Sequence, residues 1–308
     1  MPKTLTRRQL LGRTSAAMVG AYLVGGTGYG IASGASGAGA LSLGSIGWTE
    51  NIAVSNLTKA MLEDDLGYDE VPIMGPLDLG PLFAGVAGGD LSAFQDVWLP
   101  NNKQYLNKVH VKNSVKVLKP WYESKTSYGI AVPDYMDVQS LADLNKAKTD
   151  KIIGIEPGAS FMPVIRNKVI PAYNLDMKLL TSSTTGMLTT LKRKYANKEP
   201  IVFVAWSPHW MNTRYDFHYL KDPKDAQGIF NNPSRITSVV NDGLRRSDPV
   251  AYTFLTAISL DEHQINQMES EIKKAGSDEP IKGVRNWLKS NRKVVQPWID
   301  KAKKAQRS

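Results

Sequence analysis

The sequence has no cysteine and only four histidines. The absence of cysteine excludes disulfides, thiolate metal sites, a cysteine nucleophile and a lipid-modified bacterial N-terminus. No histidine lies within four residues of another, so the sequence contains no local pattern of metal ligands. There is also no run of eighteen or more apolar residues, which argues against a polytopic membrane protein. The histidines are His110, His209, His218 and His263.

Several short motifs on which enzymes depend are missing as well. The chain has no G-x-x-x-x-G-K-[ST] phosphate loop, no G-x-G-x-x-G after a strand and no G-x-S-x-G nucleophile turn. Each histidine is better interpreted as a surface or hydrogen-bonding residue than as a catalyst. We therefore predict no catalytic residue, no metal and no cofactor, although distant residues could still meet in the folded chain.

The chain is otherwise ordinary in composition. Its 308 residues are 42% hydrophobic and 22% charged, which suits a globular protein with two domains or lobes. The net charge is +9, but Lys3, Arg7, Arg8 and Arg13 contribute four of these charges within the first forty residues, where there is no acid. The rest of the chain is only mildly basic, so we do not expect nucleic acid as a partner.

The first forty residues resemble an export signal. Arg7 and Arg8 precede a weakly apolar stretch over 16–24, and small residues lead to an A-x-A-like cleavage site at 38–40. This order is typical of a twin-arginine signal, so we predict a signal peptide over 1–40 with cleavage near Ala40. The alternative is a basic tail that contains two arginines by chance. We expect a secreted or periplasmic protein that is not a lipoprotein and that is either free or retained by an uncleaved signal.

After residue 40, short apolar runs alternate with amphipathic stretches, which indicates an α/β protein. Val54, Leu57 and Met61 share a helical face, and Gly67 is a suitable stop for that helix. Beyond Pro233 the sequence predicts helices alone. Strands are predicted at 43–46, 71–74, 94–97, 128–132, 152–155, 178–181, 201–205 and 217–220, and further helices at about 163–170, 185–195, 236–245, 249–256, 261–275 and 279–296.

We interpret this order as two α/β lobes. Extended crossings near 128–135 and 217–223 would join the lobes, and the helical C-terminus would pack back on the first one. The predicted first lobe comprises 41–130 together with 223–308, and the predicted second lobe comprises 131–222.

Three of the seven tryptophans come at the ends of predicted strands. Trp48, Trp98 and Trp206 follow the strands at 43–46, 94–97 and 201–205. Open α/β sheets bind ligands at the carboxyl ends of their strands, so these three rings are candidates for one site. A single tryptophan is more often a core residue, but three equivalent positions favour binding.

A possible anion site lies at the end of a fourth predicted strand. The turn after 152–155 leads into a helix near Ser160 and Phe161, whose backbone N–H groups would face the same crevice. An aromatic cage beside an anion site suits a small zwitterion with a quaternary ammonium group. Such a group has no N–H donor, and its diffuse charge is attracted to aromatic faces by about 0.5–2 kcal/mol per contact.

Four segments around these residues resemble the motifs of a known protein family and come in the same order. A fifth segment, YLKDP at 219–223, also resembles that family. The four segments are GWTE at 47–50, VWLPNN at 97–102, IGIEPG at 153–158 and AWSPHWM at 205–211.

With these segments the chain resembles the glycine betaine and choline substrate-binding proteins of ABC-type osmoprotectant importers, over about residues 43–300. The resemblance implies a two-lobed, periplasmic-binding-protein-like fold of type II, with the ligand cleft between the lobes. It also implies that Trp48, Trp98 and Trp206 form the ammonium cage, and that the backbone N–H groups of Ser160 and Phe161 hold a carboxylate.

Some positions depart from the family pattern and leave the solute open. Similar betaine-binding proteins often have a histidine four or five residues after the tryptophan that matches Trp98, where this chain has Asn102 and Lys103. Lys103 could donate to a carboxylate in its place, or it could be a solvated lysine. Choline-binding relatives tend to have an acid and a tyrosine where this chain has Glu50 and Tyr128. Glu50 could equally be a solvated carboxylate on a first helical turn, and Tyr128 could merely cover the core.

We therefore expect a monomeric, non-enzymatic receptor that binds glycine betaine or a related betaine and delivers it to an ABC transporter permease. A choline receptor of the same family is the first alternative. An extracytoplasmic enzyme acting on a quaternary-ammonium metabolite is a second, and it would need Glu50, Glu156 or His209 as a catalyst. A basic surface adhesin is a weaker third, and it predicts a steep salt dependence of binding.

Overall fold

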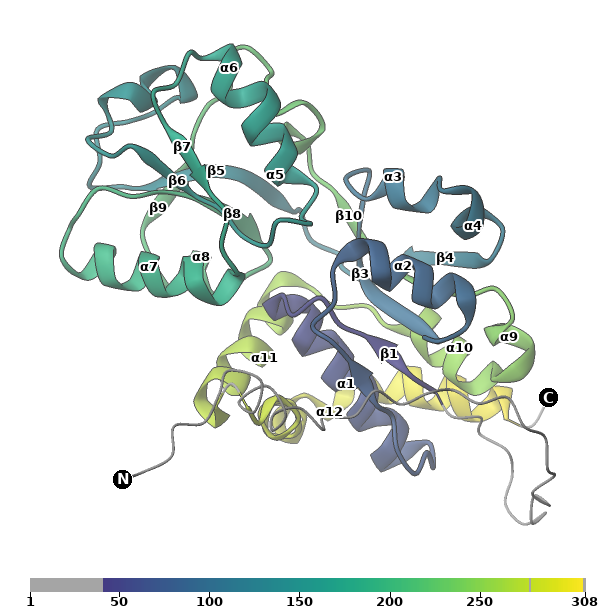
Figure 1. The fold of residues 1–308 in the computed structure, drawn as a ribbon. Coiled ribbons are helices and arrows are strands. Elements are labelled where there is room, and N and C mark those ends of the chain that lie inside the picture. The colour runs from purple at the N-terminus through teal and green to yellow at the C-terminus, as the bar shows by residue number, and fades with distance from the viewer. Residues whose placement is uncertain (1–40, 277, 307–308) are drawn as a thin grey trace, which may run out of the picture. The chain divides into compact units, whose positions relative to one another are not determined.

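The computed structural model describes residues 41–276 and 278–306. The predicted signal peptide over 1–40 lies outside the described residues. The described elements belong to one compact unit that contains two mixed five-stranded sheets (Figure 1). In the part of the chain that is described, no helix combines the length and the apolar character that a membrane span requires.

The first sheet has the strand order β2-β1-β3-β10-β4. Strand β1 pairs in parallel with β2 and β3, whereas β10 is antiparallel to both β3 and β4. Strand β3 is buried along almost its whole length, as expected for a strand covered on both faces. The strands are β1 (Leu43–Gly44), β2 (Ile73–Met74), β3 (Ala93–Leu99), β4 (Val115–Pro120) and β10 (Arg235–Asn241).

The second sheet repeats this arrangement with the order β7-β6-β8-β5-β9. Strand β6 pairs in parallel with β7 and β8, and β5 is antiparallel to β8 and β9. The strands are β5 (Ser127–Pro133), β6 (Lys151–Ile153), β7 (Lys178–Leu180), β8 (Val202–Ser207) and β9 (Phe217–Tyr219).

Helices cover both sheets. Helix α1 contacts strands of the first sheet as well as α11 and α12, which explains why it is buried on more than one side. Figure 1 shows α7 and α8 on one side of the second sheet and α5 and α6 on the other. The longer helices are α1 (Thr49–Asp65), α2 (Leu79–Gly88), α7 (Thr184–Ala196), α10 (Pro249–Ala257), α11 (Glu262–Ala275) and α12 (Pro280–Ala305).

The remaining helices are short. Three of them, α5, η2 and α6, follow one another and form one helical stretch in which η2 has π-helical hydrogen bonding. They are α3 (Lys103–Leu106), α4 (Val109–Lys112), η1 (Leu141–Lys146), α5 (Phe161–Val164), η2 (Ile165–Val169), α6 (Ile170–Ala172), α8 (Met211–Arg214), η3 (Gly228–Asn231) and α9 (Leu244–Ser247).

One predicted helix is wrong. The segment 236–245, predicted to be helical, instead forms strand β10 and, after a turn, the short helix α9. Ile236, Thr237, Val239 and Val240 are β-branched, lose rotamer freedom in a helix and pack well on a pleated surface. They are almost fully buried between β3 and β4, so β10 is an inner strand of the first sheet. Helix α2 and strand β4 were not predicted either.

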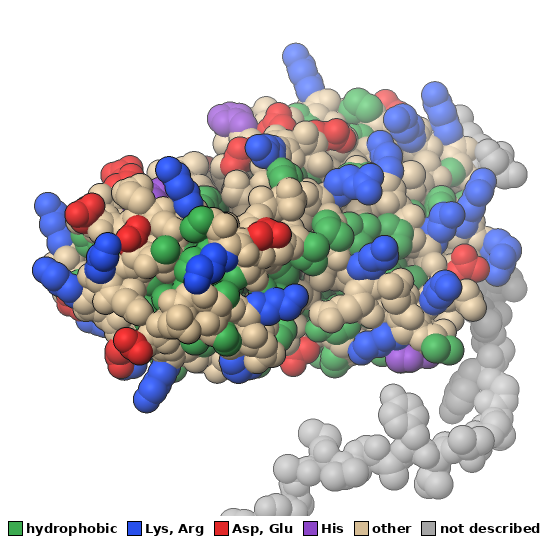
Figure 2. Space-filling view, turned by 90° about the horizontal axis from the view of Figure 1, so that it is seen from above, with side chains coloured by type: hydrophobic (Ala, Val, Ile, Leu, Met, Phe, Trp, Pro, Cys, Tyr) green, Lys and Arg blue, Asp and Glu red, His purple; other side chains and the backbone are tan. Residues whose placement is uncertain are grey.

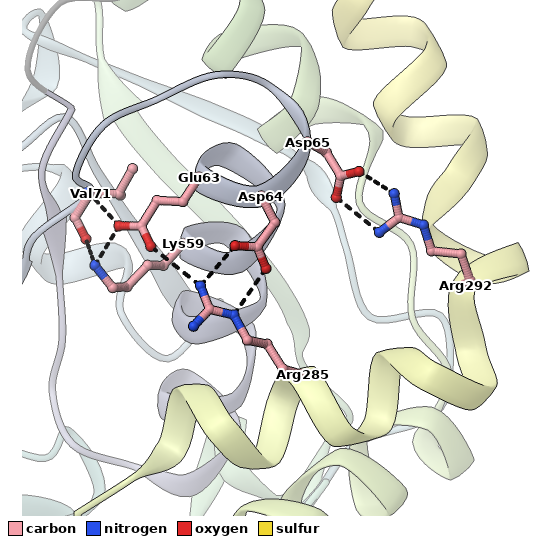
Figure 3. A network of polar contacts seen from close by, with 7 residues as sticks. All are labelled: Lys59, Glu63, Asp64, Asp65, Val71, Arg285 and Arg292. Atoms are coloured by element: carbon pink, nitrogen blue, oxygen red, sulfur yellow. Dashed lines mark hydrogen bonds and ion pairs between the residues drawn. The ribbon is translucent and has the colours of Figure 1, made fainter.

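The surface carries both signs of charge. Figure 2 shows Lys and Arg side chains spread among acidic and neutral ones on the face that it displays, rather than gathered into one stripe. Ion pairs connect helix α12 with α1: Arg285 pairs with Asp64, and Arg292 pairs with Asp65 (Figure 3).

Candidate ligand cavity

A cavity lies where residues that follow strands of both sheets meet, and it holds about 310 Å³ of empty space, its opening to solvent included. From the first-sheet side come residues after β1, residues at and after the end of β3, and Glu50 of α1. From the second-sheet side come residues of β5, β8 and the turn after β6, while Phe230 belongs to the later η3 turn. The lining residues are Trp48, Glu50, Trp98, Asn101, Asn102, Tyr128, Ile155, Ser160, Phe161, Trp206 and Phe230.

The local backbone explains how Trp48 reaches this cavity. Gly47 has a φ of +86°, a conformation that favours glycine, and it turns the chain between β1 and α1. Asn51 holds the turn because its Oδ1 accepts hydrogen bonds from Ser45 Oγ at 2.7 Å and from the Ile46 N–H at 2.9 Å. Trp48 is the residue immediately before α1, in the turn that follows β1.

The other two tryptophans lie within strands. Trp98 is the penultimate residue of β3, and Trp206 is the penultimate residue of β8. All three are buried, with exposed fractions of 6% for Trp48, 3% for Trp98 and 1% for Trp206. Each of the three side chains also lines the cavity, so these tryptophans are core residues with one part of the ring exposed to the cavity.

Tyr128 lies at the centre of the aromatic group. Its ring centroid is 5.8 Å from that of Trp98 and 6.2 Å from that of Trp206. The rings of Phe161 and Phe230 lie 5.1 and 5.4 Å from it. Trp48 completes the group at 6.5 Å from Trp206. Burial raises the pKa of Tyr128, so its hydroxyl stays protonated at neutral pH.

Each indole N–H of the three tryptophans donates to a carboxylate. Trp98 Nε1 donates to Asp96 Oδ1 at 2.8 Å within strand β3, where residues two apart share a face. Trp206 Nε1 donates to Glu50 Oε2, and Trp48 Nε1 donates to Glu156 Oε2, both at 3.1 Å. These last two bonds each join a residue near the first sheet to one of the second.

Glu50 is fully buried, so its alternative interpretation as a solvated carboxylate is wrong. Burial raises the pKa of Glu50 to about 7, and the charge of Glu156 adds to the rise, while hydrogen bonds from its backbone, Trp206 and Thr49 oppose it. Its Oε2 accepts from Trp206 and Thr49, but Oε1 has no hydrogen-bond partner among the described residues.

Two more buried acids lie behind the cavity. Burial and the charge of Glu50 raise the pKa values of Asp96 and Glu269 well above their usual range. Each of these carboxyls has one oxygen with no partner among the described residues. Within the described chain, no group of histidine and acidic side chains is arranged to hold a metal ion.

Another part of the cavity lining offers hydrogen-bond donors. The backbone N–H groups of Ser160 and Phe161 have no acceptor in the described part of the chain, whereas those of Ala159 and Met162 close the turn. Asn102 accepts from the Trp98 N–H at 2.8 Å and donates to Ser160 Oγ at 3.2 Å. The cavity therefore has aromatic walls, a buried acid at one position and unpaired N–H groups at another.

The structure brings seven of the eight predicted site residues to this cavity. Lys103 is the exception, because it is exposed on α3 and is not part of the lining. Sequence reasoning missed Asn101, Asn102, Ile155 and Phe230 as lining residues, and it missed Asp96 as a partner of Trp98. The D-x-W spacing within a strand could have revealed Asp96, but no local signal brings Phe230 to the site from η3.

Together these features define a two-sheet substrate-binding domain with an aromatic ligand cavity. A profile of the substrate-binding domain of ABC-type glycine betaine transport systems (OpuAC) matches residues 39–290. The chain belongs to this family, whose members are extracytoplasmic substrate-binding proteins rather than enzymes.

Individual proteins agree with this assignment. The chain is 34% identical over 165 residues to the glycine betaine/carnitine transport binding protein GbuC of Listeria monocytogenes, a match that covers 53% of this chain and 53% of that protein. It therefore spans about half the length of this curated relative. A lactococcal OpuAC in its closed form with glycine betaine is 31% identical, with a TM-score of 0.74 and coverage of 84% of this chain and 98% of that one.

The glycine betaine/L-proline-binding protein ProX of Borrelia burgdorferi has a TM-score of 0.76 and 24% identity, with coverage of 86% of this chain and 99% of that one. This likeness concerns the fold. The predicted type II periplasmic-binding-protein fold is confirmed by the two mixed sheets and by these structures.

Proposed function

We propose that this protein captures glycine betaine, or a closely related betaine, in the aromatic cavity and delivers it to the permease of an ABC transporter. The quaternary ammonium group would lie among Trp48, Trp98, Trp206 and Tyr128. The carboxylate would accept hydrogen bonds from the backbone N–H groups of Ser160 and Phe161.

The observation that carries this proposal is the pairing of every cage indole with an acid. Because Glu156, Asp96 and Glu50 accept the three indole N–H groups, the rings leave only carbon surface to a ligand. A ligand that relied on indole donors would find none, whereas a diffuse cation is attracted to the ring faces.

Affinity also needs the second half of the ligand. Cation–π contacts with three rings contribute about 1.5–6 kcal/mol, and a micromolar dissociation constant needs about 8. Hydrogen bonds from two unpaired backbone N–H groups to a carboxylate, at about 1.5–3 kcal/mol each, cover the difference. A betaine meets both requirements, and a simple tetraalkylammonium ion meets only the first.

Choline is the second candidate ligand, because Glu50 offers an acceptor for its hydroxyl group. The unpaired, buried Oε1 of Glu50 is an acceptor at the cavity wall, and a ligand hydroxyl could donate to it. Choline carries such a hydroxyl and lacks a carboxylate, so it would use Glu50 where a betaine uses Ser160 and Phe161.

A titration of tryptophan fluorescence with glycine betaine, proline betaine, choline and carnitine tests the proposal. We expect saturable changes, with a betaine binding most tightly. Tightest binding of choline would favour the second candidate, and no response to any of the four would contradict both.

We also propose how the chain is organised around this function. The lobes would be 41–130 with 223–308, and 131–222, and they would close on the solute. The monomeric protein would be exported through a twin-arginine signal over 1–40, outside the described residues. Mass spectrometry of the exported protein tests the cleavage near Ala40, because an N-terminus far from residue 41 would contradict it.

A further inference from the structure

A second hollow region lies along helix α7, separate from the ligand cavity. Two adjoining hollows of about 1300 and 950 Å³ share Thr185, Leu188, Trp210 and Lys273 as lining residues, so we treat them as one groove. None of its residues lines the ligand cavity.

The groove contains three cations. Lys192 comes from α7, Arg214 from α8 and Lys273 from α11, and in the described part of the chain none of them forms an ion pair. Partial burial lowers the pKa of Lys273, and the charges of Arg214 and Lys192 add to this effect. The three cations are therefore close enough to repel one another.

Neighbouring acids do not neutralise these cations. Glu199 pairs with Arg193 and Lys194 instead, and Asp216 accepts a hydrogen bond from Tyr195. Glu269 is buried and accepts the backbone N–H of Trp210 at 2.7 Å. All three cations are exposed and without an ion pair among the described residues, so they are available to carboxylates of another molecule.

The groove also has an apolar floor. Trp210 is half-buried, and Lys273 Nζ lies 3.6 Å from its ring centroid. Leu188 and Ile52 add apolar surface to the lining. Trp and Arg are frequent anchors of protein–protein contacts, and the cations around Trp210 complement the charge of an acidic segment.

We infer that this groove is a docking site for an acidic segment of a partner protein. Its carboxylates would pair with Lys192, Arg214 and Lys273, and an apolar side chain would lie against Trp210. A segment of polypeptide suits the groove better than a small anion, because the groove extends over residues from α1, α7, α8 and α11.

A selection of random twelve-residue peptides displayed on phage tests this inference on the full chain. It is run with and without glycine betaine, so that its outcome does not depend on solute binding. We expect enrichment of peptides that combine several acidic residues with a bulky apolar one. Synthetic copies should bind more weakly as salt is raised, because the contacts are charged and partly exposed.

The matched variants decide where these peptides bind. Combined Lys192→Glu, Arg214→Glu and Lys273→Glu should weaken peptide binding by about tenfold or more. Combined Lys116→Glu, Lys119→Glu and Lys168→Glu changes the net charge equally, at exposed residues outside both cavities, and should have little effect. Circular dichroism of both variants checks that each remains folded.

Three results would overturn the inference. One is a selection that enriches no acidic peptides in either arm, and another is equal loss of binding in the two charge-reversed variants. The third is full displacement of the peptide by free glutamate at the same concentration, which would indicate a site for small anions instead.

Discussion

The three cage tryptophans differ from ordinary core tryptophans in what their N–H groups contact. In the core, Trp121 donates to the backbone carbonyl of Gln95, a neutral acceptor. Trp48, Trp98 and Trp206 each donate to a carboxylate instead. These side-chain bonds fix the orientation of each ring. The acids are therefore positioning residues for the cage.

Replacing the cage rings should reduce affinity in graded steps. Trp48→Ala, Trp98→Ala and Trp206→Ala should each weaken glycine betaine binding by about 1–2 kcal/mol or more, because each removes an aromatic face. The corresponding Phe variants should lose less. Calorimetric titration measures both sets, with Lys103→Ala as a control that should bind normally since Lys103 is exposed. Normal binding by all three alanine variants would exclude the cage.

The raised pKa of Glu50 predicts that binding depends on pH. Burial raises this pKa to about 7, and Glu156, Asp96 and Glu269 are the acids that interact with Glu50 electrostatically. A bound cation favours the ionised form, so affinity should rise by about tenfold between about pH 6 and about pH 8 as Glu50 loses its proton.

The Glu50→Gln variant is the control for this pH dependence. It keeps an acceptor for Trp206 but cannot ionise, so its affinity should change little over the same range. Titrations of both proteins at several pH values give the comparison. An equally steep pH dependence in the variant would assign the effect to other groups.

At the scale of elements, the sequence predicted those strands and helices that the local pattern of apolar and polar residues indicates. The strands that lead to the cage and the helices α1, α7, α10 and α11 were predicted close to their observed positions. Strand β10 was missed although its β-branched run favours a strand, and its pairing with β3 and β4 is not local, so no neighbouring segment indicates it. Phe230 was missed for the same reason, because only the tertiary fold brings η3 beside Tyr128.

Helix α12 provides a test of which contacts hold an element in place. Arg285 forms a bidentate ion pair with Asp64, in which Nε donates to Oδ2 at 2.9 Å and Nη2 donates to Oδ1 at 2.8 Å. The Arg285 side chain is nevertheless 45% exposed. Trp298 is 5% exposed and packs against Phe254. Exposed pairs contribute about 0.2–1 kcal/mol, whereas truncation of a buried aromatic residue costs about 3–5.

Arg285→Lys should therefore lower the free energy of unfolding by less than about 1 kcal/mol, and Trp298→Ala by several times more. Urea denaturation of the two variants measures this directly. The opposite ranking would mean that the ion pairs in Figure 3, rather than the packing of Trp298 against α10, hold α12 in place.

At the scale of the whole molecule, hydrogen bonds link the two sheets around the cavity. Besides the bonds of Trp48 and Trp206, Ser207 Oγ donates to Glu262 Oε1 at 2.5 Å, and Tyr105 OH donates to the Gly158 carbonyl at 3.2 Å. A solute that contacts both sides adds to these links, so it should favour the form in which they are made.

Small-angle X-ray scattering should then show a smaller radius of gyration with saturating glycine betaine than without it. A profile that stays the same at saturation would mean that the proposed lobes do not move relative to each other when the solute binds.

The central claim is that the cavity recognises the positive charge of a quaternary ammonium group through aromatic faces. Calorimetric titration of the full chain with glycine betaine and with 3,3-dimethylbutanoate tests it most directly. The second compound has the same shape and carboxylate, but a carbon replaces the charged nitrogen. We predict one site for glycine betaine and binding of the analogue weaker by at least about tenfold, because its cation–π contacts are lost. Equal affinity for the two compounds, or no binding of glycine betaine, would contradict the account.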